Sequence, residues 1–261
     1  MWRHKYELYE EAVQSPEADV AFIINEYKKI RKKAPHSLRE DFCGTGALLS
    51  AWVAHSDAHS SVGIDLDPEP IRYGMKARDA ELSPAQQSKL RFVQGNVLKA
   101  THHKADVICA FNYSYYIFKK RDVLLEYFRC VRRSLNKKGL FFLDAFGGTE
   151  AMAEFREHRS ISGFTYYWHC ESFNPLTHDC FYSIHFRRNK KGAPLHRRVF
   201  TYDWRFWTMP ELKDLLIEAG FKRVRTYWEG DDKNGGGNGV FKDTEVAENC
   251  ESWISYLVAE I

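Results

Sequence analysis

The hydrophobic residues of this chain change their spacing from one segment to the next, and the changes predict alternating helices and strands. Residues 17–32 carry apolar side chains from Val20 to Ile30 at the spacing of a helix with one buried face. Residues 140–146 form a nearly continuous apolar run, which is typical of a parallel strand in the centre of a sheet. By the same criteria we expect further helices at 6–14, 47–56, 123–135 and 210–219, an extended segment that begins at Leu38, and further strands at 61–67, 90–97, 105–111, 221–228 and 253–259.

The order of these elements predicts the α/β fold class, with a doubly wound, mostly parallel seven-stranded sheet whose last strand is antiparallel. We assign residues 35–162 and 208–261 to this domain and residues 1–34 to an N-terminal helical cover. Within residues 163–207 the apolar positions alternate, which predicts a small antiparallel sheet inserted as a lid. Its three expected strands are 164–173, 179–188 and 196–202. The glycine-rich segment 231–239 is expected to be a mobile loop.

The composition is that of an ordinary globular protein, with 44% hydrophobic and 28% charged residues among 261. No apolar run approaches the roughly 20 residues that a membrane span needs. The N-terminal segment lacks the apolar core of a secretory signal. The six cysteines form no Cys-x-x-Cys pair, which argues against a zinc site and fits a reducing compartment. We therefore expect a cytoplasmic protein with no membrane partner and no metal.

One basic run bears on the choice of partner. The net charge of +3 is too small to indicate nucleic acid by itself. Residues 28–33 contain five cations and could form an electrostatic footprint for RNA. The same residues also fit the last turn of a helix, where cations complement the helix dipole. We favour the second interpretation, so nucleic acid is the less favoured partner.

The segment from Leu38 runs directly into Cys43-Gly44-Thr45-Gly46 and then into the helix at 47–56. Such a turn presents free backbone N–H groups and the positive end of a helix dipole to a ligand. Glu40 and Asp41 lie at the strand end and would repel the pyrophosphate of a dinucleotide. Leu49 replaces the third glycine of the dinucleotide fingerprint, and the Lys-Ser/Thr pair of a P-loop is absent. A ligand with a cationic end therefore fits this loop better than a nucleotide phosphate.

Two polar residues follow the next strands. Asp65 lies about 20 residues beyond Gly46, where the adjacent strand of a doubly wound sheet delivers an acid to both ribose hydroxyls. An acid there can also cap a helix, but Asp67-Pro68 already fits that role, so we favour the ribose. Asn96 follows the third strand and has an amide oxygen that can accept a hydrogen bond. A plain turn residue is the alternative for Asn96.

The residues Cys43-Gly44-Thr45-Gly46, with Glu40 before them, resemble motif I of the class I methyltransferases that depend on S-adenosylmethionine (SAM). The chain departs from that motif at Asp41, where an apolar residue is usual, and at Phe42, where the first glycine is usual. The resemblance covers about four fifths of the chain, without the N-terminal segment and the lid. It implies a Rossmann-like SAM-binding domain, with Asn96 accepting from the adenine amine. The cofactor-binding residues expected on this basis are Glu40, Cys43, Gly44, Thr45, Gly46, Asp65, Leu66, Asn96, Val97, Phe111 and Asn112.

The methyl acceptor is expected above the loop at 112–116, because ligands of such sheets bind beyond the carboxyl ends of the strands. Tyr113, Tyr116 and His169 are the expected catalytic residues, although an ordinary helix-capping loop and a structural histidine are the alternatives. Tyr115, Trp204, Arg205 and Trp207 are the expected substrate residues, with core packing as the alternative for the tryptophans. We expect in-line methyl transfer to a small molecule, bound beneath the lid. The alternatives are a methyltransferase acting on RNA or protein, a non-catalytic SAM-binding module and, less favoured, a nicotinamide-dependent dehydrogenase.

Overall fold

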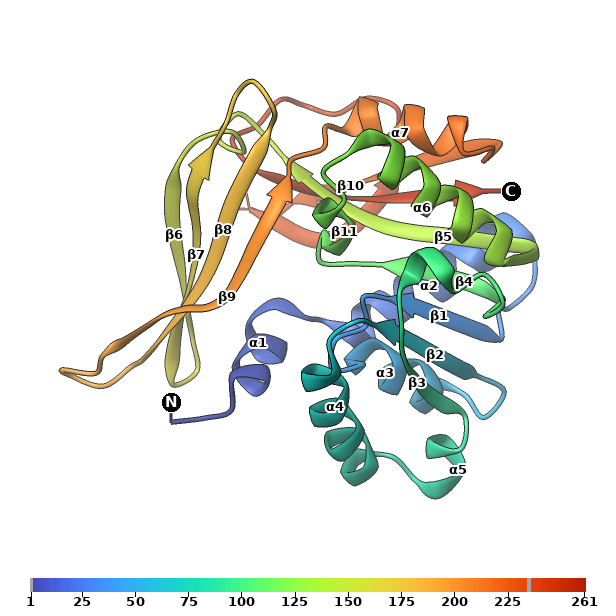
Figure 1. Cartoon of the computed structure of the whole chain (residues 1–261), viewed down its shortest axis with the longest axis horizontal. Helices are drawn as coiled ribbons and strands as arrows, with labels where there is room; N and C mark the ends of the chain where they lie inside the picture. The colour runs from blue at the N-terminus through green and yellow to red at the C-terminus, as the bar shows by residue number, and fades with distance from the viewer. Residues whose placement is uncertain (1, 234–235) are drawn as a thin grey trace.

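The structure is a computed structural model that describes residues 2–233 and 236–261. Two sheets and a set of helices make up the described part (Figure 1). The helices are α1 (Lys5–Val13), α2 (Pro16–Arg31), α3 (Ala47–His55), α4 (Pro68–Glu81), α5 (Pro84–Gln87), α6 (Arg121–Ser134) and α7 (Met209–Glu218), with the short 3-10 helices η1 (Val97–Lys99) and η2 (Ser114–Ile117). None of the helices within those ranges is long and apolar enough to cross a membrane.

The large sheet has the strand order β11-β10-β12-β5-β4-β1-β2-β3. Its strands are β1 (Ser37–Asp41), β2 (Ser60–Asp65), β3 (Leu90–Gln94), β4 (Ala105–Ala110), β5 (Leu135–Gly147), β10 (Arg223–Asp231), β11 (Gly237–Asp243) and β12 (Trp253–Glu260). The neighbours from β5 through β3 are parallel, whereas β12 is antiparallel to both β5 and β10. The predicted fold class and the antiparallel last strand are confirmed.

This sheet contains one strand more than predicted, because β11 pairs antiparallel with β10 at one edge. The prediction of a mobile loop at 231–239 is therefore wrong for Asp231 and for residues 237–239, which belong to β10 and β11. Residues 234–235 of that predicted loop lie outside the described residues. β11 is a mostly exposed edge strand that is rich in glycine. Its sequence therefore lacks the apolar alternation by which a strand is identified.

The second sheet is antiparallel and has the strand order β6-β7-β8-β9. Its strands are β6 (Phe155–Ile161), β7 (Phe164–Phe173), β8 (Asp179–Arg188) and β9 (Leu195–Arg205). The three predicted strands are present, but β6 precedes the expected start of the insert at residue 163. Its middle residues are exposed and mostly charged, so its sequence carried no apolar pattern.

The two sheets share one hydrophobic core. Tyr182 and Trp204 of the small sheet belong to the same buried cluster as Phe141 and Leu143 of β5. On the other face of the large sheet, α2 and α3 pack over a second cluster. The helix α1 lies beside the small sheet (Figure 1), where Leu8 packs in a third cluster with residues of β7 and β8. The division of the chain into the predicted domains stays a proposal.

The basic run at 28–33 occupies the end of α2. Lys28, Lys29 and Arg31 stand in its last turn, and Lys32 is the C-cap with a left-handed backbone (φ 57°). Arg31 pairs with Glu260 of β12 at 2.9 Å. At least this cation of the run therefore fastens the helix to the sheet.

Candidate cofactor and acceptor site

The cofactor loop connects β1 with α3 at the carboxyl end of the sheet. Three of its residues have left-handed backbone angles, namely Phe42 (φ 60°), Gly44 (φ 53°) and Gly46 (φ 70°). The backbone N–H of Gly44 donates to Oδ2 of Asp65 at 2.8 Å. The carboxylate at the end of β2 therefore fixes the loop at the end of β1.

Asp41, which stands where an apolar residue is usual, is fully buried but well paired. Nε and Nη2 of Arg39 donate to its two carboxylate oxygens at 2.7 and 3.0 Å. The hydroxyl of Tyr127 donates to the same carboxylate at 3.0 Å. Phe42, the second departure, packs its ring against Phe118 and Tyr127. Both unusual residues are thus anchored beneath the loop by groups outside it.

The close approach of helix to strand, which the third glycine of a dinucleotide fingerprint permits, comes from a glycine on the next strand. Leu49 of α3 packs over Gly63 of β2, and a Cβ at Gly63 would lie only 2.4 Å from Cδ1 of Leu49. A Cβ at Gly74 of α4 would lie 2.1 Å from the backbone oxygen of Thr45. These two glycines let the surrounding elements approach the loop closely.

Glu40, near the end of β1 and before this loop, has a carboxyl group that is not fully hydrogen-bonded. It is buried, and its Oε2 has no hydrogen-bond partner among the described residues. Burial, together with the negative charges of Asp19, Asp65 and Asp41, holds the pKa of Glu40 well above its usual range. A buried carboxylate without a partner is costly. A cationic ligand group at this place would satisfy it.

A cavity of about 570 Å³ lies beyond the adjoining strand ends. It is bounded by α1, the start of α2, the residues after β4, the ends of β5 and β12, and the inner face of the small sheet. Since β4 pairs with β1, the residues that follow β4 lie next to the cofactor loop. The lining side chains are Tyr9, Ala12, Val13, Ser15, Asp19, Phe111, Asn112, Tyr113, Asp144, Glu157, His158, Arg159, Tyr166, Trp168, Ile184, Tyr202, Trp204, Ile254 and Tyr256.

Two of the carboxylates that line this cavity, those of Asp144 and Asp19, accept hydrogen bonds from neighbouring groups. Asp144, at the end of β5, accepts backbone N–H groups from Asn112 at 2.7 Å and Tyr113 at 2.9 Å. Asp19 accepts the hydroxyl of Tyr256 at 2.6 Å. Burial raises the pKa of Asp144 to about 7 and the pKa of Asp19 to about 6. Both groups change charge close to neutral pH.

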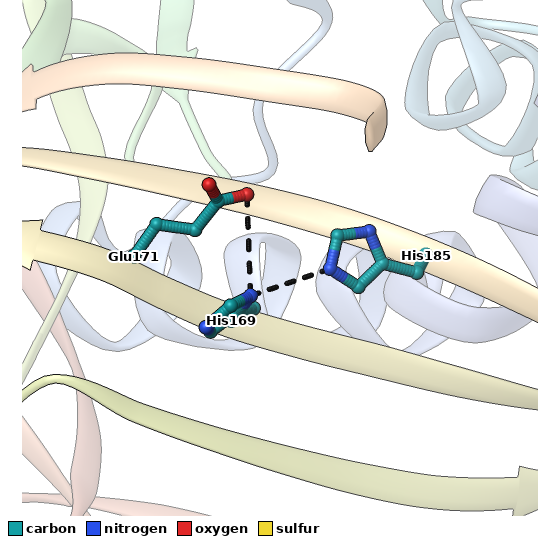
Figure 2. Close-up of side chains that lie close together, drawn as sticks. All are labelled: His169, Glu171 and His185. Atoms are coloured by element: carbon teal, nitrogen blue, oxygen red, sulfur yellow. Dashed lines mark hydrogen bonds and ion pairs between the residues drawn. The ribbon is translucent and has the colours of Figure 1, made fainter. Parts of the chain in front are cut away.

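A cluster of His169, Glu171 and His185 lies on the other face of the small sheet (Figure 2). Their donor atoms lie within 4.8 Å of one another, which is close enough to consider a metal. However, Nδ1 of His185 accepts the backbone N–H of Arg198 at 2.8 Å, so the neutral ring carries its proton on Nε2, the nitrogen that faces His169. A histidine that ligates a metal instead donates its second N–H. Glu171 is also paired with the guanidinium of Arg198. The geometry is that of a hydrogen-bond network.

Residues 43–141 match the model of a family described as a methyltransferase domain. This part of the chain therefore matches a methyltransferase domain. No protein with a curated description matches the chain in sequence.

Solved structures of methyltransferases share the fold over nearly the whole chain. An S-adenosylmethionine-dependent methyltransferase from Clostridium acetobutylicum has a TM-score of 0.69 at 17% identity, with 97% of this chain and 96% of that chain covered. The SAM-bound amino pentose methyltransferase CalS10 from Micromonospora echinaspora has a TM-score of 0.69 at 13% identity, with 100% and 98% covered. The sugar N-methyltransferase KedS8 from a Streptoalloteichus species has a TM-score of 0.64 at 15% identity, with 99% and 92% covered.

SAM fits the residues of this methyltransferase domain. The unpartnered Oε2 of Glu40 suits the ammonium of a methionine group. Asp65 accepts N–H groups of Gly44 and Asp67 but keeps further lone pairs for ribose hydroxyls. Leu66, next to Asp65, is exposed, so its apolar side chain is available to an adenine ring. SAM is the cofactor of this domain class, and it supplies an electrophilic methyl group on a sulfonium.

The structure places the other expected cofactor residues around the same edge. The amide oxygen of Asn96 accepts the N–H of Leu98 at 2.9 Å, which is the turn role weighed above as its alternative. Val97 and Cys43 are buried. The hydroxyl of Thr45 donates to Glu10 of α1, so this helix lies across the loop. Phe111 and Asn112 line the cavity instead of the nucleoside side.

Of the expected acceptor residues, only Tyr113 and Trp204 line the cavity. Tyr115 and Tyr116 are fully buried, and their hydroxyls donate to backbone oxygens of Asp144 and Trp207. The catalytic role predicted for Tyr116 and the substrate role predicted for Tyr115 are therefore not supported, because both hydroxyls are used inside the core.

The structure does not support the expected roles of Trp207, Arg205 and His169 either, because their side chains are engaged elsewhere or face away from the cavity. Trp207 is buried and donates its indole N–H to Phe118 at 3.2 Å. Arg205 pairs with Glu211 at 3.0 Å and stacks on Trp207, so it is not available to a substrate carboxylate. His169 stands between Trp168 and Cys170 on β7, and its side chain is on the face away from the cavity that Trp168 lines.

Sequence reasoning missed Asp19 and Asp144, two of the three carboxylates that line the cavity. Asp144 lies in an apolar strand, and a charged residue within such a run is the one signal that could have identified it. Asp19 lies in the first turn of α2, where an acid is expected for helix stability alone. Nothing in the sequence pattern showed that these two acids would line the same cavity.

Proposed function

We propose that this protein transfers the methyl group of SAM to a small molecule held in the cavity between the large and small sheets. The observation that carries the proposal is the position of this cavity. It is lined largely by aromatic side chains and includes residues 111–113 after β4, the strand that pairs with β1 at Glu40. The side chain of Glu40 has an oxygen without a partner among the described residues. A volume of about 570 Å³ is in the range of small-molecule sites.

The residues have separate tasks in this proposal. Glu40 would hold the cationic end of SAM, Asp65 the ribose and Asn96 the adenine edge. Tyr9, Tyr113 and Trp168 would enclose the acceptor and exclude water. Methyl transfer from a sulfonium is an in-line displacement, so alignment of the reacting atoms at about 3 to 3.5 Å supplies much of the catalysis. No covalent protein intermediate is needed.

Structurally similar proteins support a small acceptor, since they include an amino pentose methyltransferase and a sugar N-methyltransferase. A second basic run, at 187–191, contains Arg187, Arg188, Lys190 and Lys191. A macromolecular acceptor would require this run and the one at 28–33 beside the cavity mouth. The first run ends α2, and Arg31 within it is paired with Glu260. Neither run contributes a residue to the cavity lining.

Methyl-labelled SAM tests the proposal. The protein is incubated with separate metabolite, RNA and protein fractions of the cells that encode it. We expect label in the metabolite fraction. Label confined to RNA or protein would contradict a small acceptor, and loss of label from SAM without any methylated product would indicate that the domain has lost transfer.

A further inference from the structure

We infer that the acceptor is an amine, whose nitrogen lies between Asp144 and Asp19, and that Asp144 takes up its proton. This inference rests on the proposed function and adds the acceptor class and a catalytic residue. It is carried by the carboxylate pair, the loop that holds one member of it and the aromatic walls around both.

Asp144 is held by an unusual stretch of backbone. Asn112 and Tyr113 are consecutive residues with left-handed angles (φ 56° each), a conformation that tyrosine rarely adopts. This conformation turns both N–H groups toward the two oxygens of Asp144. Each carboxylate oxygen can accept a second hydrogen bond. The strained loop therefore fixes the carboxylate while leaving it able to accept from a ligand in the cavity.

The charges around the cavity favour a cation over a neutral hydroxyl. Asp19 lies near enough that its charge acts on Asp144, and Glu157 adds a third carboxylate at the edge strand β6. Arg159 is the one arginine among the described lining residues, and its guanidinium donates to the backbone oxygen of Ala12. An ammonium would make charge-assisted hydrogen bonds to the two aspartates, which are stronger than those of a hydroxyl.

The aromatic walls point to the same acceptor class. Tyr166 and Trp168 of β7, and Tyr202 and Trp204 of β9, face the cavity from the small sheet. Tyr9 of α1 adds a further ring to this wall and packs against Phe200 of β9. Aromatic faces attract cations electrostatically, and more strongly where water is excluded. A cationic nitrogen is thus favoured before transfer and, as a methylated ammonium, after it.

The reaction moves one proton and one methyl group. The ammonium gives a proton to the Asp144 carboxylate, which becomes a neutral acid. The freed lone pair on nitrogen forms the new N–C bond with the methyl group, the C–S bond breaks, and its electron pair stays on sulfur. The product is a methylated ammonium with a neutral thioether. Because burial raises the pKa of Asp144 to about 7, this group can accept a proton near neutral pH.

The rate should therefore rise as the pH increases through about 7, where Asp144 becomes ionised. Other groups around the cavity also titrate or carry charge. The groups that face Asp144 or share its cavity are Tyr9 of α1, Asp19 of α2, Tyr113 after β4, Glu157, His158 and Arg159 of β6, Tyr166 of β7, Tyr202 of β9 and Tyr256 of β12. Of these, Asp19 is the acid whose charge raises the pKa of Asp144.

The first test identifies the methylated atom. The protein is incubated with SAM carrying a ¹³C-methyl group and a metabolite extract, and the product is examined by NMR, in which the methyl shift distinguishes nitrogen from oxygen, sulfur and carbon. We expect N-methyl signals. An O-, S- or C-methyl product would overturn the amine inference while leaving the proposed function intact. SAM binding without any transfer to the extract would instead overturn the proposed function.

The second test concerns Asp144, with the same extract as acceptor. Asp144→Asn should lower the transfer rate by about a hundredfold and abolish its rise near pH 7, while SAM affinity measured by calorimetry stays within a few fold. Asp57→Asn, on an exposed turn after α3, is the matched control and should change neither. An unchanged rate and pH profile in Asp144→Asn would overturn its role as proton acceptor.

A third variant keeps the test decisive if Asp144→Asn does not fold. Burial is the main cause of the raised pKa of Asp144, and Asp19→Asn removes a negative charge that adds to it. The rising limb of the pH profile should therefore move to lower pH. A limb that does not move would contradict the assignment of that limb to Asp144.

Discussion

Near the cofactor loop, the cost of burying one charged side chain is offset by hydrogen bonds from its neighbours. Asp41 would be costly in the core, but Arg39 and Tyr127 satisfy it. Removing one partner of such a buried pair leaves an uncompensated charge, so these residues depend on one another. The loop thus keeps its shape although its sequence departs from the usual motif at two positions.

The packing of Leu49 over Gly63 gives the first prediction. Gly63→Ala should reduce the free energy of unfolding by about 1 to 3 kcal/mol, because its Cβ would overlap Cδ1 of Leu49. Leu49→Ala alone leaves a cavity and also destabilises. Since the smaller side chain removes the overlap with Leu49, although not the one with Cys43, the double variant should be more stable than the sum of both losses predicts. Urea denaturation measures all three variants, and strict additivity would show that the overlap does not matter.

Asp65 gives the second prediction. Asp65→Ala should weaken the binding of both SAM and its demethylated product at least tenfold, because hydrogen bonds to a charged acceptor contribute about 1.5 to 3 kcal/mol each. Calorimetry measures the affinity, and circular dichroism checks that the fold is kept, since Gly44 also loses its partner. Undiminished affinity would remove Asp65 from the ribose site without affecting the rest of the assignment.

At the scale of elements, the small sheet has two faces with different surroundings. The cavity face of β7 carries Tyr166 and Trp168, whereas His169 belongs to the network with Glu171 and His185. This network lies where the sheet is irregular, since the register shifts between Cys170 and Ser172. Such bulges increase the local twist of a sheet. We interpret the network as a support for the curvature of the sheet over the cavity.

The two faces of β7 give the third prediction. Tyr166→Ala should raise the KM for the acceptor about tenfold or more, because it removes an aromatic wall, while SAM affinity stays within a few fold. His169→Ala is the matched control from the other face and should leave KM nearly unchanged. Steady-state kinetics with a purified acceptor fraction measure both. A large loss of transfer in His169→Ala with normal Tyr166→Ala kinetics would reverse this assignment of the faces.

At the scale of the whole molecule, local patterns in the sequence predicted most of the large sheet. Its parallel strands are apolar runs with turn residues at their ends, and the carboxyl ends of parallel strands must share an edge. The charged strand β6 and the glycine-rich edge strand β11 were not predicted, because neither has the apolar alternation by which strands are identified.

The candidate site was only partly predictable. The cofactor loop and Asp65 were accessible because spacing along the chain determines their positions. The acceptor cavity was not, because Asp19 and Asp144 are distant in sequence and meet only through the packing of α2 against the sheet. Aromatic residues such as Tyr116 and Trp207 have the right composition for a substrate wall, but the shared core of the two sheets uses them instead.

The central claim is that the loop after β1 holds SAM. A calorimetric titration of the intact protein with SAM, with its demethylated product and with NAD tests it most directly. We predict saturable binding of the first two, one molecule per chain, and no measurable binding of NAD, because the buried carboxyl of Glu40 disfavours a pyrophosphate at this place. Tight binding of NAD without binding of SAM would contradict the account.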